Sequence, residues 1–105
     1  MSLKILNNKY LNFLGLARKA GKLIAGTEKV KALIKQKKAC LIILANDISL
    51  KTEKELKFIA KDEILVMRTD YSIEQLSCAL GTKAGVYAVT DKNFAEQIKL
   101  KGGTL

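Results

Sequence analysis

The residues best suited to chemistry in this chain surround Gly26, where a short apolar segment passes into a lysine-rich helical pattern. Glycine lets a backbone approach closely, and the N–H groups of Thr27, Glu28 and Lys29 would have no partner at a helix start. Such N–H groups and the helix dipole bind phosphate. The Glu28 carboxylate opposes a naked phosphate but could accept hydrogen bonds from a guanine edge. The segment is therefore either an anion site or a simple strand-to-helix turn.

The composition argues against several classes of enzyme. The chain has no histidine, which removes Ser-His-Asp and Cys-His catalytic groups and every metal site that needs an imidazole. A P-loop is excluded because five residues separate Gly15 from Gly21 and Leu23 replaces the magnesium-binding Ser or Thr. Cys40 and Cys78 match no zinc motif and lie among apolar residues, so we expect two buried free thiols. We expect a non-catalytic protein without a cofactor or a metal site.

The excess basic charge is confined to the first forty residues. This segment has ten lysines and arginines and one acid, Glu28, whereas residues 41–105 have nine basic and nine acidic side chains. A mixed surface would be sufficient for solubility, so a one-sided charge favours a polyanionic partner. The alternative is a lysine-rich face that only contacts solvent.

The length predicts one domain over residues 1–105 with a single core. No apolar run reaches the roughly 18 residues that a membrane span needs, and the N-terminus lacks the apolar core of a signal peptide. We therefore expect a cytoplasmic protein that does not bind membranes.

Helical and strand patterns alternate along the chain. Apolar residues at helical spacing and continuous apolar runs predict five helices and four strands. The expected helices cover residues 4–20, 27–38, 52–62, 72–80 and 91–100, and the expected strands cover residues 23–25, 41–45, 64–67 and 86–89. The runs at 41–45 and 64–67 predict strands that are covered on both faces. This alternation predicts a three-layer α/β/α sandwich with a small mixed sheet of about four strands.

Capping patterns define the expected helix starts. The candidate caps are Thr27, Thr52 with Glu55, Ser72 with Gln75, and Asp91. Gly21 and Gly81 are expected to end the first and fourth helices, and the chain is expected to fray from Lys101 onward.

Several segments resemble the kink-turn RNA-binding ribosomal protein superfamily, which includes ribosomal proteins L7Ae and L30e. The similar segments are FLGLARKAG at 13–21, GKLIAGTEKVKALIK at 21–35, ACLIILAND at 39–47, SIEQLSCALG at 72–81 and VYAVTDKNFA at 86–95. They span about residues 10 to 98 and are most similar to the small bacterial members. The resemblance implies an α/β/α sandwich.

The resemblance also implies that the second helix inserts its N-terminus into a kinked RNA helix, while the loop after the fourth helix closes over an extruded base. The superfamily motif reads Gly, any residue, Asn, Glu, any two residues, Lys. Gly26 matches it, whereas Glu28, Lys29 and Ala32 replace the Asn, Glu and Lys. The closing loop at 81–85 keeps its glycines and loses most of its apolar residues. The expected RNA-binding residues are Lys22, Gly26, Thr27, Glu28, Lys29, Lys31, Lys35, Thr82, Lys83 and Ala84.

The residues and the resemblance together predict non-catalytic binding of structured RNA, either ribosomal RNA or a kink-turn-like internal loop. A ribosome-associated monomer is expected, with ribosomal proteins as a second class of partner and no small-molecule substrate. The alternative is a protein-interaction module on the same fold that docks to ribosomal or transcription factors.

Overall fold

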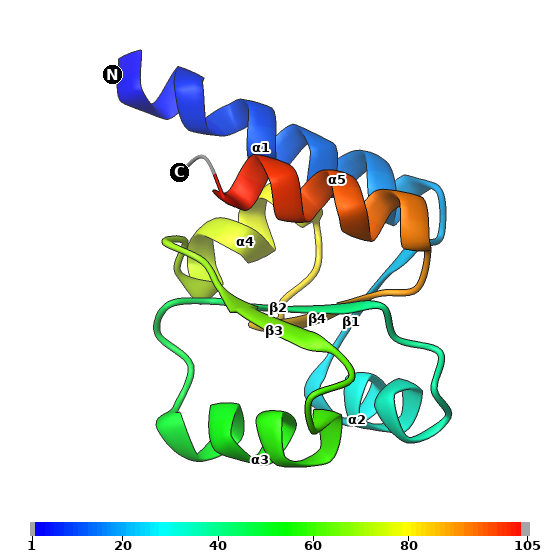
Figure 1. Cartoon of the computed structure of the whole chain (residues 1–105). Helices are drawn as coiled ribbons and strands as arrows, with labels where there is room; N and C mark the ends of the chain where they lie inside the picture. Colours follow the sequence, from blue (N-terminus) through cyan, green and yellow to red (C-terminus); the bar gives the residue numbers. More distant parts are fainter. Residues whose placement is uncertain (1, 104–105) are drawn as a thin grey trace.

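The computed structural model describes the backbone of residues 2–103 and the side chains of residues 10–100. Helices and strands alternate in the order α1 (Ser2–Lys19), β1 (Leu23–Ala25), α2 (Thr27–Lys35), β2 (Leu41–Leu44), α3 (Leu50–Ala60), β3 (Leu65–Arg68), α4 (Ile73–Leu80), β4 (Val86–Val89) and α5 (Lys92–Gly103). Helices α1, α4 and α5 cover one face of the sheet, and α2 and α3 cover the other (Figure 1). The predicted α/β/α sandwich with four strands is confirmed.

The sheet is mixed, with strand order β1-β4-β2-β3. Strand β4 is antiparallel to both β1 and β2, and β2 is parallel to β3. The carboxyl ends of β1, β2 and β3 therefore lie at the same end of the sheet as the start of β4. None of the described helices is long and apolar enough to cross a membrane.

Alternation along β2 explains its continuous apolar run. Leu41 and Ile43 pack against α1, α4 and α5, whereas Ile42 and Leu44 pack against α2 and α3. Each of these side chains is at most 1% exposed, and burying one contributes about 1.5 to 3 kcal/mol. The strand is therefore covered on both faces, as predicted.

Strand β3 differs from its prediction. It lies at the edge of the sheet, where Leu65 is half exposed and Arg68 is exposed, so the expectation of a strand covered on both faces is wrong.

Two other expectations, on the cysteines and on the end of α5, are also wrong. Cys78 is an exposed thiol rather than a buried one, and Cys40 is half-buried. Helix α5 continues through Gly103 instead of fraying from Lys101, while residues 104–105 lie outside the described part.

The helix caps agree with the sequence at two of four positions. Ser72 and Gln75 form the predicted capping box, and Asp91 Oδ1 accepts from the N–H group of Phe94 at 3.0 Å. Helix α3 is instead capped by Ser49, three residues before the predicted cap Thr52. The Ser49 hydroxyl accepts from the Thr52 N–H group at 3.1 Å. Thr27 is likewise not a cap, since it is the first helical residue and Gly26 precedes it.

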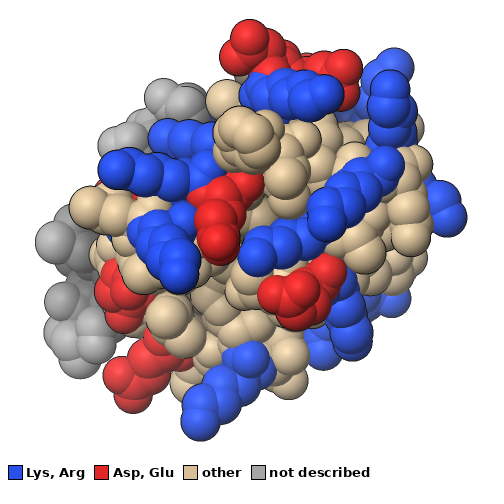
Figure 2. All heavy atoms as spheres, turned by 90° about the horizontal axis from the view of Figure 1, so that it is seen from below, with Lys and Arg blue, Asp and Glu red and all other residues tan. Residues whose placement is uncertain are grey.

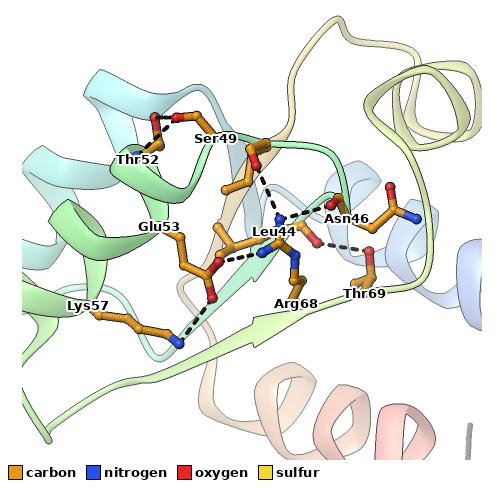
Figure 3. A network of polar contacts seen from close by, with 9 residues as sticks. Leu44, Asn46, Ser49, Thr52, Glu53, Lys57, Arg68 and Thr69 are labelled. Carbon is orange, nitrogen blue, oxygen red and sulfur yellow. Dashed lines mark hydrogen bonds and ion pairs between the residues drawn. The ribbon is translucent and has the colours of Figure 1, made fainter.

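A polar network fixes the connection from β2 to α3 (Figure 3). Arg68 donates to the carbonyl oxygens of Asn46 at 2.9 Å and Ile48 at 3.2 Å, and it forms an ion pair with Glu53. The same Glu53 carboxylate lies 3.0 Å from Lys57 Nζ. The exposed edge strand thereby holds the start of α3 in place.

Candidate functional site

The β1–α2 junction and the α4–β4 loop meet at one end of the sheet. The Gly26 N–H group donates to the Val86 carbonyl at 2.9 Å, directly after the loop at 81–85. The Ala45 N–H group donates to the Gly85 carbonyl at 2.9 Å, which brings the end of β2 to the same place. The structure therefore brings two of the predicted segments, Gly26 to Lys29 and Thr82 to Ala84, to a common surface, which we call the carboxyl-end surface.

Helix α2 begins without a side-chain cap. Gly26 has φ 114° and ψ 133°, a conformation that residues with a Cβ rarely adopt. The first hydrogen bond of the helix joins the Val30 N–H group to the Gly26 carbonyl at 2.9 Å. No described residue accepts from the N–H groups of Thr27, Glu28 or Lys29. Side chains cap the starts of α3, α4 and α5, so α2 has the open start among these four helices.

Lys29 lies beside this open helix start, and Lys83 lies in the loop that leads into β4 at the same end of the sheet. A Cβ on Gly26 would lie 4.0 Å from Cδ of Lys29, so the Lys29 stem runs along the glycine. Lys29 and Lys83 are both exposed, and neither forms an ion pair with a side chain that the structure describes. Their ammonium groups are therefore available to an anionic ligand.

Lys31 is in a different environment. Its Nζ atom lies 3.7 Å from a carboxylate oxygen of Glu28 and 3.4 Å from one of Glu55, and its side chain is only 23% exposed. The two carboxylates partly neutralise this lysine. Its main role in the free protein is to tie α2 to α3.

Lys22 and Lys35 lie away from the carboxyl-end surface. The Lys22 carbonyl accepts from the Thr90 N–H group at 2.9 Å, at the amino end of β1, and the four extended steps across β1 separate it from Gly26 by about 13 Å. Lys35 is the last residue of α2, about 12 Å from its start. The structure therefore divides the predicted contact residues between the two ends of the sheet.

The α4–β4 loop is anchored at Ala84 and Gly85. The Ala84 N–H group donates to the Ser77 hydroxyl at 3.1 Å, and the Tyr87 hydroxyl donates to the Ala84 carbonyl at 2.9 Å. Burial raises the pKa of the Tyr87 hydroxyl, against the Ser77 hydrogen bond and the positive charge of Arg18, which favours a protonated donor. A Cβ on Gly85 would lie 2.7 Å from Ile73 Cγ1, so glycine is required for close packing. Only Thr82 and Lys83 are left at the tip of the loop.

Sequence reasoning missed a hollow beside this loop. It has a volume of about 640 Å³ and is lined by Asp47, Ile73, Glu74, Ser77, Cys78, Gly81, Thr82 and Lys83. The Asp47 carboxylate accepts from the Ile73 N–H group at 2.8 Å, which fixes one wall. The available signal was the position of Asp47 just after a buried strand, where ligands often bind in α/β sheets.

The basic side chains of residues 1–40 do not all lie on one surface. Arg18 Nε donates to the Leu80 carbonyl at 2.7 Å, so this side chain ties α1 to the end of α4. Figure 2 shows the face covered by α2 and α3, where basic side chains are numerous and acidic ones lie among them. The charge excess is therefore spread over this face as well as over the carboxyl-end surface.

The fold and the site together define a small α/β/α domain with an open, lysine-flanked helix start. Among the described residues, no three side chains of metal-binding type lie together. The chain belongs to the Ribosomal protein L7Ae/L30e/S12e/Gadd45 family, whose model matches residues 8–100. This match confirms the resemblance.

Similar proteins include one curated relative and two solved structures. The RNA-binding protein YlxQ of Enterococcus faecium is 33% identical over 91 residues, which cover 87% of this chain and 88% of that protein. A protein of unknown function from Bacillus halodurans has a TM-score of 0.82 and 29% identity, covering 88% of this chain and 94% of that one. The Giardia lamblia 15.5kD RNA binding protein has a TM-score of 0.74 at 18% identity, covering 94% and 88%, and shows the fold alone.

The family and the curated relative are described by ribosomal membership and by binding rather than by a reaction. The expectation of a non-catalytic protein is thereby confirmed.

Proposed function

We propose that this protein binds structured RNA without catalysis and that the carboxyl-end surface makes the central contact. The observation that carries the proposal is the open start of α2, where three N–H groups have no acceptor among the described residues and Lys29 lies beside them, with Lys83 exposed in the loop at the same end of the sheet. Backbone N–H groups at a helix start and flanking ammonium groups are both phosphate ligands. The family match and the RNA-binding relative support RNA as the source of those phosphates.

The preferred RNA is a bent or internally looped helix that is recognised by shape and backbone. Glu28, Lys29 and Ala32 stand where the superfamily motif has Asn, Glu and Lys, so standard kink-turn contacts are reduced. Phosphate contacts position an RNA without reading its sequence. Glu28 adds one base-specific contact in this proposal, because its exposed carboxylate can accept from a guanine edge.

The remaining predicted contacts have graded roles. Thr27 and Gly26 contribute backbone groups, Thr82 and Lys83 close over the RNA from the loop, and Ala84 holds the loop in position. Lys31 joins the contact by releasing one of its carboxylate partners. Lys22 and Lys35 reach only RNA that extends beyond the carboxyl-end surface.

Filter binding tests the proposed shape preference. The intact protein should bind an internally looped or kinked helix more tightly than a plain duplex or a single strand of equal length, because only the bent helix fits both segments of the surface. Equal affinity for all three RNAs would remove the shape claim, and a lack of binding at low salt would remove the RNA claim.

A paired lysine variant tests the position of the surface. Lys29→Ala combined with Lys83→Ala should make the slope of log affinity against log salt shallower by about 2, or roughly one per phosphate contact. The matched control is Lys19→Ala with Lys92→Ala, two exposed lysines away from this surface, and it should retain the original slope. Equal slopes for the two double variants would place the RNA elsewhere.

We further propose that the protein acts as a ribosome-associated monomer in the cytoplasm. The ribosomal proteins in the name of its family support the ribosome association. Crosslinking in cells followed by sequencing of the bound RNA should return mainly ribosomal RNA. Purification with and without ribonuclease is the companion measurement. Partners that survive digestion, without enriched RNA, would favour the protein-interaction alternative.

A further inference from the structure

The aromatic side chains are unequally distributed over the two layers. Five of the six pack between the sheet and the layer of α1, α4 and α5, namely Tyr10, Phe13, Tyr71, Tyr87 and Phe94. The sixth, Phe58, lies on α3 and is 82% exposed. Single exposed apolar residues are common on proteins, so the neighbours of Phe58 decide whether its position is informative.

Phe58 borders a groove between α2 and α3. The groove has a volume of about 360 Å³ and is lined by Lys31, Lys35, Lys54, Glu55, Phe58 and Ile59. Lys51 and Lys54 share the outer side of α3 with Phe58, because residues three, four and seven positions apart lie on one side of a helix. Lys61 extends the same side just beyond the last turn. Phe58 therefore shares its side of α3 with several lysines, on the face where basic side chains are numerous (Figure 2).

The lysines in and beside this groove are mostly without acidic partners. Lys35, Lys51 and Lys54 form no ion pair with any side chain in the described range. Of the acids on α3, Glu55 is paired with Lys31, and Glu53 is engaged by Arg68 and Lys57. Asp62 and Glu63 follow the helix end as exposed acids. The local charge around the ring thus favours an anionic partner.

We propose that the α2–α3 groove binds a single-stranded RNA segment that continues from the structured RNA, with one base stacked on Phe58 and phosphates on Lys35 and Lys54. This inference rests on the proposed RNA-binding function. Stacking on an aromatic ring tolerates any base, and lysines follow the backbone, which together form the usual arrangement for single strands. A protein partner would require a contiguous apolar centre, whereas this groove offers one aromatic ring and part of Ile59.

The path between the two surfaces is short. Helix α2 begins at the carboxyl-end surface and ends at Lys35 in the groove, a distance of about 12 Å. Lys31 lies between them and faces α3 through Glu55. A strand that leaves the start of α2 can therefore run along this helix into the groove.

Binding of paired RNAs tests the proposal. One RNA is an internally looped helix alone, and the other carries a single-stranded extension of about ten nucleotides, within the usual site size of such domains. The intact protein should bind the extended RNA about tenfold more tightly than the helix alone, and Phe58→Ala should remove this gain. Phe58→Trp should keep it, whereas Phe58→Leu should lose it, because a leucine preserves apolar contact without a stacking surface.

The matched control is Leu16→Ala, which removes another exposed apolar side chain, on α1 in the opposite layer. This variant should bind both RNAs like the intact protein, and both alanine variants should retain the original Tm, since neither residue is buried. An extension that adds no affinity, or adds as much to Phe58→Ala as to the intact protein, overturns the proposal. So does a gain that Phe58→Leu retains.

Two further measurements address other occupants of the groove. Polyglutamate is titrated as an acidic peptide, and sedimentation without RNA measures self-association; a Phe58-dependent signal in either one overturns the RNA proposal. A free single strand of about ten nucleotides is titrated separately. Its Phe58-dependent binding would support the groove even if no structured RNA binds, so that failure of the central surface and failure of the groove are told apart.

Discussion

The two helical layers pack on the same sheet but expose different chemistry. The layer of α1, α4 and α5 contains five of the six aromatic residues, including a stacked pair of Tyr10 and Tyr71 with ring centroids 5.9 Å apart. The layer of α2 and α3 has an aliphatic core around Val30, Ile34 and Leu56 and presents lysines and the exposed Phe58 outward. Aromatic packing and the proposed RNA contacts are therefore largely separated across the sheet.

Helix starts show the same division on a smaller scale. In α4, the Gln75 N–H group donates to the Ser72 hydroxyl at 3.0 Å, and the Ser72 N–H group donates to the Gln75 side chain at 2.8 Å. In α2, Gly26 offers no side chain, and the first N–H groups have no acceptor among the described residues. The capped start of α4 stabilises the fold, whereas the uncapped start of α2 leaves its N–H groups available to an anionic ligand.

The largest expected effect comes from a cavity in the aromatic-rich layer. Leu14 on α1 is 1% exposed, and Leu14→Ala should lower the free energy of unfolding by about 2 to 5 kcal/mol. RNA affinity of the folded protein should stay unchanged, because α1 lies on the face opposite α2. Urea unfolding and filter binding at low temperature measure the two quantities. A loss of RNA affinity in the fully folded Leu14→Ala variant would contradict the proposal that packing and RNA contact are divided between the two helical layers.

The Tyr10 hydroxyl should make stability depend on alkaline pH. It is buried without a hydrogen-bond partner among the described residues, and burial, with repulsion from Tyr71, raises the pKa of Tyr10 to about 12. The folded state therefore keeps this proton between pH 10 and 12, while the unfolded state loses it. The contribution is fully present below pH 10 and is lost as pH rises through 12, which amounts to about 1.4 kcal/mol at pH 11.

Tyr10→Phe isolates this contribution. The variant should match or slightly exceed the intact protein in stability at pH 8, since it removes an unpaired buried hydroxyl. At pH 11 it should be more stable than the intact protein by about 1.4 kcal/mol relative to that baseline. Urea titrations at both pH values provide the measurement. Parallel losses in the two proteins would assign the alkaline loss to other groups.

Sequence predicted the elements well because their signals are local. Strand β2 lies where a continuous apolar run placed it, and the Ser72–Gln75 capping box needs only four consecutive residues. The predicted start of α3 was wrong because Ser49 and Thr52 are both residue types that cap helices. The local sequence pattern alone cannot choose between them. The prediction that β3 is covered on both faces was wrong because the edge position of a strand depends on the order of strands in the whole sheet.

The candidate site was predictable to a similar extent. Gly26 and the loop at 81–85 could be expected to contribute because glycines and a helix start are visible in the sequence. The pairing of Lys31 with Glu55 was not visible, since the two are 24 positions apart and meet only through packing of α2 on α3. The separation of Lys22 from Gly26 was visible, because the predicted strand at 23–25 lies between them.

The smallest expected effect on the free energy of unfolding comes from substitutions at the starts of α4 and α2. Ser72→Ala removes the bond that the Gln75 N–H group donates to the Ser72 hydroxyl, and should lower the free energy of unfolding by about 1 kcal/mol. Thr27→Ala removes a side chain that caps nothing, so stability should stay within about 0.5 kcal/mol of the intact protein. Thermal and urea unfolding at pH 7 measure both variants.

The RNA affinity of the same two variants should not follow their stability. Neither substitution removes a backbone N–H group, so both folded proteins should keep the affinity that the open start of α2 provides. If Thr27→Ala destabilised the protein as much as Ser72→Ala, then the Thr27 side chain would satisfy the start of α2. The phosphate-binding role proposed for those N–H groups would then lose its basis, because a closed α2 would resemble α4.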